Sequence, residues 1–363
     1  MSRNILFLVT GMTPQIITET IWALACDENN SENWVPDEVH VLSTQDGLNQ
    51  IRKRLFEDGV FEQFKRDYPV LEQIEFNPST HLHVIVDQNG KSLIDLKTPE
   101  DNERSADIIC EKIKEFTNME DTSVHVSIAG GRKTMGFYAG YALSLYGRAQ
   151  DSLSHVLVEE KFEKASNFFY PTPTEHLVSD RDEKVVGNAQ EAQVWLAKIP
   201  FVRMRNSLSK KSRVTKLPFS TVIADINRAM QDIKITLNTK YRTITVNDVT
   251  IHDLSTRAFA YFACFIIDAQ MEGNGWSRPS KKKEIMSEDF LKLISRIYEG
   301  SSSEIYFTQQ WFDEAKSELK DSLIEKLGMD MADKILPQQE SRGKPYSLNI
   351  AKDSISIIKV DDV

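Results

Sequence analysis

The sequence has little cysteine, no long apolar run and a deficit of positive charge. Only three cysteines occur in 363 residues, without CxxC or histidine-pair spacing, so neither a disulfide framework nor a structural zinc site is expected. No stretch approaches the roughly 18 unbroken apolar residues of a membrane span, and the run 5–9 is too short for a secretory signal core. We therefore expect a cytoplasmic protein with no membrane partner, in which Cys26, Cys110 and Cys264 are small buried side chains.

The deficit of positive charge limits the kind of partner. The formal net charge is -10, from 44 lysines and arginines against 54 aspartates and glutamates. Binding to long nucleic acids without sequence preference requires a strong positive field, so a protein that coats DNA or RNA is disfavoured. A small pocket for a compact phosphorylated ligand remains open. With 363 residues, 40% hydrophobic and 27% charged, the chain fits two or three globular domains.

The first half alternates short apolar runs with amphipathic segments, the pattern of βα units around a mostly parallel sheet. Strands are expected at 5–10, 39–44, 82–87, 124–129 and 155–158. Helices are expected at 15–26, 47–57, 100–116 and 133–146. We predict an α/β, Rossmann-like, doubly wound domain over residues 1–206, with a flap at about 159–195 where charged and proline-containing segments interrupt the pattern.

The last third, 207–363, follows a different pattern after the basic linker 210–213. Short antiparallel strands are expected at 233–237, 243–246 and 249–251, followed by a helix with Ser255 as its N-cap. Helical patterns at 288–298 and 308–326 precede a terminal hairpin that pairs 346–350 with 355–358. This order resembles a winged helix-turn-helix, so we expect a smaller α+β, winged-helix-like domain. A dimerisation or scaffolding domain explains the same pattern equally well.

A first loop with groups suited to phosphate follows the first expected strand. It consists of Thr10, Gly11, Met12, Thr13, Pro14 and Gln15. Open α/β sheets bind ligands outside the carboxyl ends of their strands, and free N–H groups at a helix N-terminus suit phosphate oxygens. Gly11 permits close backbone approach, Pro14 suits the first helical turn, and Thr13 offers a hydroxyl. A well-capped turn without a ligand explains the same residues.

A second loop of this kind follows the fourth expected strand. It consists of Ala129, Gly130, Gly131, Arg132, Lys133 and Thr134. Cations at a helix start oppose the helix macrodipole and need an anion, which favours a phosphate site over solvated charges. Walker A and G-x-G-x-x-G spacings are absent, which disfavours nucleoside triphosphate and NAD chemistry. Neither loop contains histidine and no acidic cluster has metal-ligand spacing, so we expect no cofactor and no metal.

The loop 43–47, after the second expected strand, is a third candidate. Thr44 and Asp46 lie where a ligand over the strand ends can be reached. Asp46 either hydrogen-bonds a ribose or base, or caps the following helix, and capping is the favoured interpretation.

Taken in order, these motifs resemble a known family. The segments 4–15, 18–20 and 127–135 are similar to the CRISPR-associated Rossmann fold (CARF), and more narrowly to the Csm-six-like CRISPR-associated ring nucleases. Segments 141–148, 151–158 and 199–203 also fit, so the resemblance covers residues 1–206. It implies a homodimer whose two domains form a cleft for a cyclic oligoadenylate, the messenger of type III CRISPR systems. It further implies metal-independent cleavage by the ribose 2′-hydroxyl, which leaves linear products with 2′,3′-cyclic phosphate ends and switches off antiviral signalling.

The resemblance also assigns roles to residues. Lys133 is expected to stabilise charge in the transition state, and Arg132 to orient the same phosphate or to point into the dimer interface. Thr13 is expected to bind the scissile phosphate or to position the 2′-hydroxyl. The remaining expected ligand-binding residues are Thr10, Gly11, Met12, Pro14, Gln15, Thr44, Asp46, Ala129, Gly130, Gly131 and Thr134. A two-fold cleft suits an even-numbered ring, with cyclic tetra-adenylate as the first choice and a ring of six as the second.

Two other functions compete with this one. Arg148 and His155 have the R-x(4–6)-H spacing of HEPN ribonucleases, but they lie in the Rossmann-like region, and His155 is favoured as a core or interface histidine. HEPN activity is therefore disfavoured. The remaining alternative is a sensor without catalysis that passes ligand occupancy to the winged-helix-like domain and so to DNA. Segments 278–283 and 342–344 would then contact phosphates.

Overall fold

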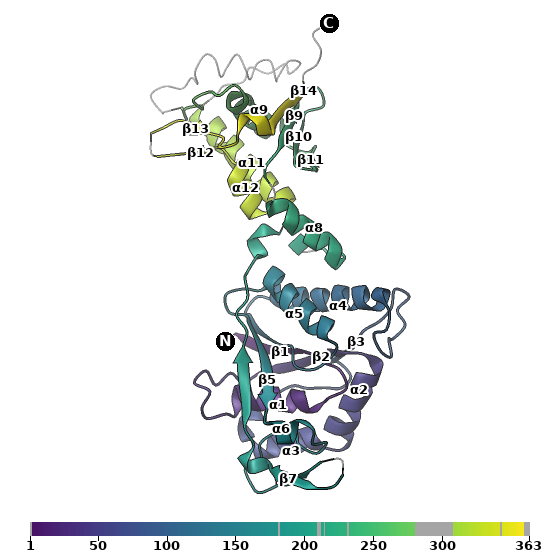
Figure 1. Cartoon of the computed structure of the whole chain (residues 1–363). Helices are drawn as coiled ribbons and strands as arrows, with labels where there is room; N and C mark the ends of the chain where they lie inside the picture. Colours follow the sequence, from purple (N-terminus) through teal and green to yellow (C-terminus); the bar gives the residue numbers. More distant parts are fainter. Residues whose placement is uncertain are drawn as a thin grey trace. The chain divides into compact units, whose positions relative to one another are not determined.

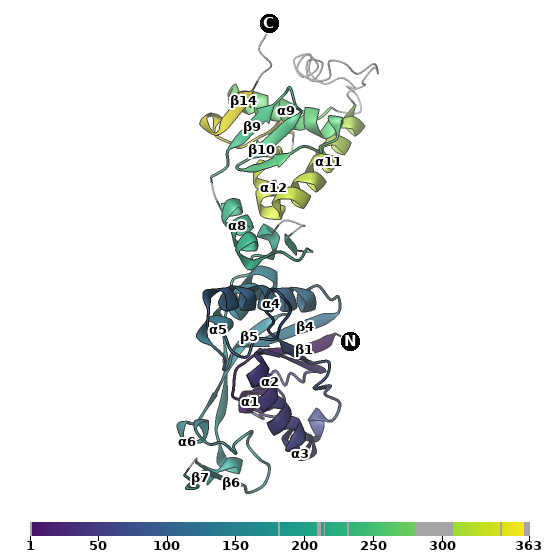
Figure 2. The same ribbon diagram turned by 90° about the vertical axis from the view of Figure 1, so that its right-hand side faces the viewer.

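The computed structural model describes residues 2–180, 182–208, 212–213, 215–230, 232–279, 308–341 and 343–358. The chain divides into two compact units, Met1–Arg205 and Asn206–Val363 (Figures 1 and 2). Each unit buries its own apolar core. Of the helices in these described ranges, none has the length and apolar character needed to cross a bilayer.

A six-stranded sheet forms the centre of the first unit, with strand order β3-β2-β1-β4-β5-β8. The strands are β1 (Arg3–Val9), β2 (Glu38–Ser43), β3 (Leu82–Val84), β4 (Thr122–Ser127), β5 (Ser152–Val158) and β8 (Val194–Lys198). The first five run parallel, and β8 pairs antiparallel with β5. The prediction of an α/β unit with a mostly parallel sheet is therefore confirmed, and the strand order is compatible with a Rossmann-like fold.

Helices cover both faces of this sheet (Figure 1). One face carries α1 (Gln15–Ala25), α2 (Gln45–Ile51), the π-helical turn η1 (Arg52–Glu57) and α3 (Val60–Asp67). The other face carries α4 (Pro99–Thr117) and α5 (Lys133–Tyr146). Because β1 is covered on both sides, its apolar run is fully buried, with Phe7 packed on Phe116 of α4 at 5.4 Å between ring centroids.

The expected flap contains regular structure that the sequence analysis missed. It forms α6 (Glu160–Glu163) and a hairpin of β6 (Leu177–Ser179) with β7 (Val185–Asn188), and it ends in β8. The edge strand β8 exposes 48% of Trp195 while burying Val194. Its four apolar residues directly follow the charged and proline-containing flap, and its antiparallel pairing with β5 lies outside the repeat of βα units, so the predicted pattern did not include it.

A second, four-stranded sheet belongs to the second unit, with strand order β11-β10-β9-β14. Its strands are β9 (Ile235–Asn238), β10 (Thr243–Val246), β11 (Val249–Ile251) and β14 (Ile355–Ile358), and the described helices are α8 (Phe219–Met230), α9 (Thr256–Gln270), α11 (Gln309–Leu327) and α12 (Met329–Ile335). The antiparallel β9–β11 segment and the N-cap Ser255, which accepts from the Ala258 N–H, are confirmed. Phe259, Phe262 and Phe265 of α9 lie at the centre of the core.

The predicted terminal hairpin is wrong. The strand β13 (Tyr346–Ser347) pairs antiparallel with β12 (Gln338–Gln339), whereas β14 pairs parallel with β9. Joining β9 places Ile355 opposite Ile235 and buries it in the core, so apolar burial rather than sequence proximity selects the partner. The predicted helix at 288–298 lies outside the described residues.

Candidate functional site

The loops that follow β1 and β4 meet at the carboxyl edge of the first sheet. The strands β1 and β4 are neighbours, with Leu8 opposite Ser127 near their ends. From β1 the chain continues to β2 on one side, and from β4 it continues to β5 on the other. This junction is the switch point at which open α/β sheets bind their ligands. The two loops predicted from the sequence therefore lie together.

Glycines allow these two loops to touch backbone to backbone. A β-carbon on Gly11 would lie 2.9 Å from the Gly131 Cα, closer than real side chains approach. A β-carbon on Gly130 would lie 2.6 Å from the Ile16 Cδ1 atom. Gly130 and Gly131 also have φ angles of 80° and 76°, a left-handed conformation that favours glycine. The paired glycines thus form one continuous backbone surface at the strand ends.

The loop after β2 joins the same surface. The Ser43 hydroxyl donates to the Thr10 carbonyl oxygen at 2.8 Å. A β-carbon on Gly47 would lie 2.6 Å from the Gly11 carbonyl oxygen. Thr44 is the N-cap of α2 and accepts from the Gly47 N–H at 3.4 Å, while Asp46 is an exposed residue of the first turn. The favoured capping role of Asp46 is therefore wrong, because Thr44 has the extended backbone that an N-cap requires.

Two helices begin at this surface without side-chain caps. In the described structure, α1 follows Pro14 and α5 follows Arg132, and neither residue caps its helix through a side-chain hydrogen bond. Neither helix has an acidic residue in its first turn. Uncapped N–H groups at helix N-termini carry partial positive charge and favour anions. The junction is therefore electropositive at close range, although the chain as a whole is acidic.

The two cations of the second loop differ in their partners. Arg132 pairs with Asp95, which lies in the loop after β3, with Nε 3.2 Å from Oδ1. This guanidinium lowers the pKa of the Asp95 carboxyl. Lys133 is exposed, and within the described ranges no carboxylate pairs with it. The anion expected for Arg132 is thus supplied by the chain itself, whereas Lys133 is available to a ligand.

The hydroxyl groups near the junction lie at different depths. Thr10 is completely buried, and its Oγ1 atom has no hydrogen-bond partner among the described residues. Thr13 and Thr134 are exposed at the starts of α1 and α5. Met12 exposes 56% of its surface. Thr13 and Thr134 are therefore accessible to a bound ligand, whereas the Thr10 side chain is buried in the protein interior.

A cavity of about 290 Å³ opens beside the first loop. Its wall includes Thr13, Gln15 and Gly130 of the two loops, together with Glu19 of α1 and His155 of β5. The Gln15 Nε2 atom donates to the Ser166 carbonyl oxygen at 3.2 Å, while its Oε1 atom is buried without a described partner. His155, expected in a core or an interface, is part of this wall.

Glu19 is a buried acid in the wall of this cavity and is not among the residues predicted from the sequence. Burial, with a smaller contribution from the Glu163 carboxylate, raises the pKa of Glu19 to about 8. Its carboxyl group is therefore neutral at pH 7 and can donate a hydrogen bond. A signal was present, because Glu19 lies one helical turn after Gln15 in a helix whose neighbouring residues are mostly apolar or small.

The HEPN-like spacing has a structural explanation. The Arg148 Nη2 atom lies 2.9 Å from the Asp151 Oδ1 atom, and Nη1 donates to the Met119 carbonyl oxygen at 2.8 Å. Asp151 is buried and also accepts from the Val124 N–H at 3.0 Å. Arg148 therefore joins the starts of β4 and β5, while His155, in the middle of β5, lines the cavity.

The basic residues expected to contact DNA are only partly described. Arg278 pairs with Asp313 of α11, with Nε 2.6 Å from Oδ1. The residues 281–283 and Arg342 lie outside the described ranges.

The family model for CRISPR-associated protein NE0113 matches residues 13–232, a range that starts in the first loop and includes the second. No curated protein matches the chain.

Proposed function

Because the chain belongs to the CRISPR-associated protein NE0113 family, we propose that its first unit is a CARF domain that binds and cleaves cyclic oligoadenylate. The observation that carries this proposal is the contact between Gly11 and Gly131 at the switch point. It brings the uncapped starts of α1 and α5 and the exposed Lys133 to one edge of the sheet. Such an edge offers N–H donors and a cation to phosphate oxygens.

The cavity beside this edge supports a nucleotide ligand. Its volume of about 290 Å³ is close to the lower limit of about 300 Å³ for small-molecule pockets. Gln15 contributes an acceptor and the neutral Glu19 a donor, which together suit the exocyclic amine and a ring nitrogen of a purine. The phosphates of a cyclic oligoadenylate would then lie over the glycine loops with a base in the cavity.

Cleavage needs in-line geometry and charge stabilisation. The 2′-oxygen forms a bond to phosphorus, the bond from phosphorus to the 5′-oxygen breaks, and the 2′-hydroxyl proton is lost while the 5′-oxygen gains one. Lys133 stabilises the negative charge that develops on the phosphorus oxygens, and Thr13 positions the reacting ribose or phosphate. Arg132 can add a bidentate contact once its guanidinium leaves Asp95. In this route, all charge stabilisation comes from the chain.

A homodimer is part of the proposal. Phe137 of α5 exposes 62% of its surface, and its ring lies 5.7 Å from that of Tyr141 one turn later. Met12, in the first loop, is also exposed. Exposed apolar groups beside a ligand site are typical of subunit interfaces. A second copy packed on α5 would bring two sets of loops to one two-fold cleft, which suits cyclic tetra-adenylate.

The proposal is tested by incubating the purified chain with cyclic tetra-adenylate in EDTA and separating the nucleotides. Linear di-adenylate with a 2′,3′-cyclic phosphate end is expected. Lys133→Ala should lower turnover about 100-fold or more while retaining ligand binding, and Thr13→Ala should have a smaller effect. Lys184→Ala, which removes an exposed lysine from the β6–β7 hairpin, is the matched control and should be unchanged.

The outcomes separate the enzyme from the sensor. Unchanged turnover in Lys133→Ala would overturn the role of that lysine. Intact ligand after long incubation, together with ligand-dependent and salt-sensitive DNA binding, would favour a sensor that acts through a winged-helix-like second unit. Absence of binding to rings of four and of six adenylates would refute both.

A further inference from the structure

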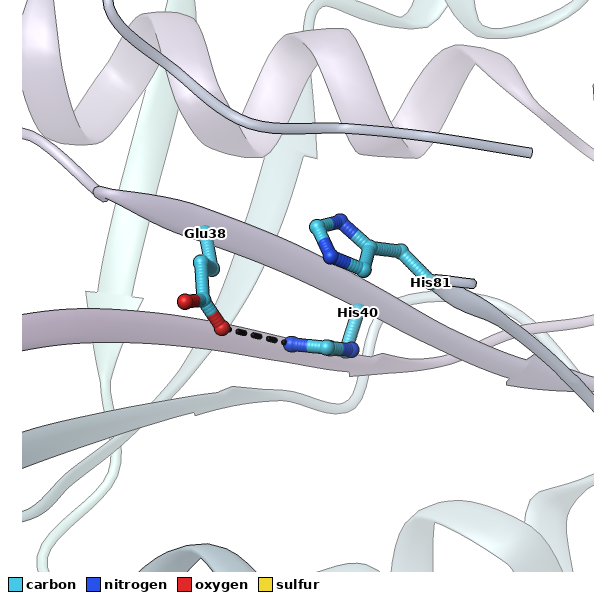
Figure 3. Close-up of side chains that lie close together, drawn as sticks. All are labelled: Glu38, His40 and His81. Carbon is cyan, nitrogen blue, oxygen red and sulfur yellow. Dashed lines mark hydrogen bonds and ion pairs between the residues drawn. The ribbon is translucent and has the colours of Figure 1, made fainter. Parts of the chain in front are cut away.

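A second group of side chains lies at the start of β2, far along the strand from the glycine loops. Glu38 and His40 are two residues apart on β2 and therefore share one face of the sheet. His81 directly precedes the edge strand β3, and its carbonyl oxygen accepts from the Val41 N–H at 2.9 Å. Figure 3 shows the three side chains grouped together. One donor atom from each lies within 4.8 Å of the other two.

The spacing of these donors is close to that of a metal site. Zinc binds histidine nitrogen and carboxylate oxygen at about 2.0–2.2 Å, so neighbouring donors of a tetrahedral ion lie about 3.3 Å apart. The His40 Nε2 and Glu38 Oε2 atoms are 3.0 Å apart (Figure 3). The third donor, on His81, lies within 4.8 Å of the other two, and its partly buried side chain leaves room for the adjustment that a bound ion would require.

Surrounding groups orient each donor. Arg3 donates to the Glu38 Oε1 atom at 2.8 Å, which leaves Oε2 for the group. The His40 Nδ1 atom lies 3.1 Å from the His83 Nε2 atom, so His83 can accept the proton that His40 keeps when Nε2 binds a metal. Outer partners of this kind fix the tautomer of a metal-binding histidine.

The His81 ring can carry its proton on either nitrogen, and a bound metal ion would fix which one. Its Nδ1 atom lies 3.2 Å from the Glu75 carbonyl oxygen and 3.3 Å from the Asn77 backbone nitrogen. A metal bound at Nε2 selects the tautomer in which Nδ1–H donates to Glu75. In the other tautomer, Nε2 carries the proton and Nδ1 accepts a hydrogen bond from the Asn77 backbone N–H.

We propose that Glu38, His40 and His81 bind one zinc ion, with water in the fourth position. Two imidazoles and a carboxylate are a common zinc ligand set. Lys112 of α4 places a positive charge near His40 and His83, which opposes the binding of a cation. Its ammonium group is paired with the Glu115 carboxylate at 3.0 Å. The ion would join β2 to the segment that leads into β3, a strand of three residues at the edge of the sheet. The site would therefore lie apart from the proposed cleavage site, and its fourth position would stay open to water, as in zinc sites with three protein ligands.

The test uses the full chain without an affinity tag, treated with EDTA and then dialysed free of it. Isothermal titration with zinc chloride should show one ion per chain, and zinc should raise the melting temperature. His81→Asn should weaken zinc binding about 100-fold or more, and His83→Asn about 10–100-fold. His176→Asn, which removes an exposed histidine of the flap, is the matched control and should bind like the parent chain.

Two results would overturn the proposal. One is the absence of stoichiometric zinc binding to the parent chain. The other is equal zinc affinity in the parent chain and in His81→Asn, with His81→Asn shown to be folded by circular dichroism. Because no ring cleavage is measured, failure here is distinct from failure of the proposed function.

Discussion

The buried carboxyl group of Glu19 should make the stability of the first unit depend on pH. Its pKa is raised from 4.5 to about 8, mainly by burial. Between these values the unfolded chain has lost a proton that the folded chain keeps, so the free energy of unfolding falls as pH rises, by about 1.4 kcal/mol per pH unit. The full contribution is present below pH 4.5 and is lost at about pH 8, a total of about 5 kcal/mol.

Glu19→Gln removes this dependence because glutamine is nearly isosteric with the protonated acid. From about pH 6 to 8.5, the stability of the variant relative to the parent chain should rise by about 2–3 kcal/mol, because the slope flattens as Glu19 of the folded chain itself loses its proton near pH 8. Hydrogen exchange of peptides from α1, at about pH 6 and 8.5 and corrected for intrinsic rates, measures opening of this unit without requiring the whole chain to unfold in one step. Other titrating groups act equally on both proteins, so their effects cancel in the difference.

Glu160→Gln is the matched control, since the Glu160 side chain is 87% exposed. Its stability relative to the parent chain should not change with pH. A relative stability of Glu19→Gln that stays constant from pH 6 to 8.5 would refute the buried, protonated state of Glu19. A fall with rising pH would show a carboxylate stabilised by partners rather than a neutral acid.

Two further predictions concern the loops and the proposed dimer. Gly11→Ala should destabilise the first unit by about 1–3 kcal/mol, because its β-carbon would lie 2.9 Å from the Gly131 Cα. Hydrogen exchange of the loops measures this, and Gly140→Ala, whose β-carbon makes an ordinary contact in α5, should be neutral or stabilising. Phe137→Glu should weaken self-association at least about tenfold in sedimentation equilibrium, and an unchanged dimer would exclude this face of α5.

Much of the first unit could be predicted because its signals are local. The apolar run of β1 is continuous because this strand is buried on both faces of the sheet. The bounds of α5 agree with its predicted range, 133–146, because the glycine pair precedes an apolar pattern of helical period. The contact between Gly11 and Gly131 follows from the order of the strands, which brings the two loop-bearing strands side by side.

Pairings between distant segments could not be predicted in this way. Asp95 lies 37 residues before its partner Arg132, and nothing in either local sequence specifies the pair. His40 and His83 are separated by 43 residues, although the alternation of Glu38 with His40 places polar side chains on one face of a strand. The parallel partner of β14 depended on which edge of the second sheet buries Ile355, a property of the folded unit.

Because Asp95 is paired with Arg132, its carboxylate competes with any bound anion for the Arg132 guanidinium. An anion that engages the Nε and Nη2 donors of Arg132 must displace Asp95, so its apparent affinity is reduced by the free energy of that ion pair. The pair is solvent-exposed, with 56% and 34% of the two side chains accessible, so this free energy is at most about 1 kcal/mol, or about fivefold in affinity. A ligand with several phosphates overcomes this penalty through its other contacts, whereas a single small anion does not. The Asp95 side chain is released in the exchange, so occupancy of the site removes one of the contacts that hold the loop after β3, a segment that the ligand need not touch.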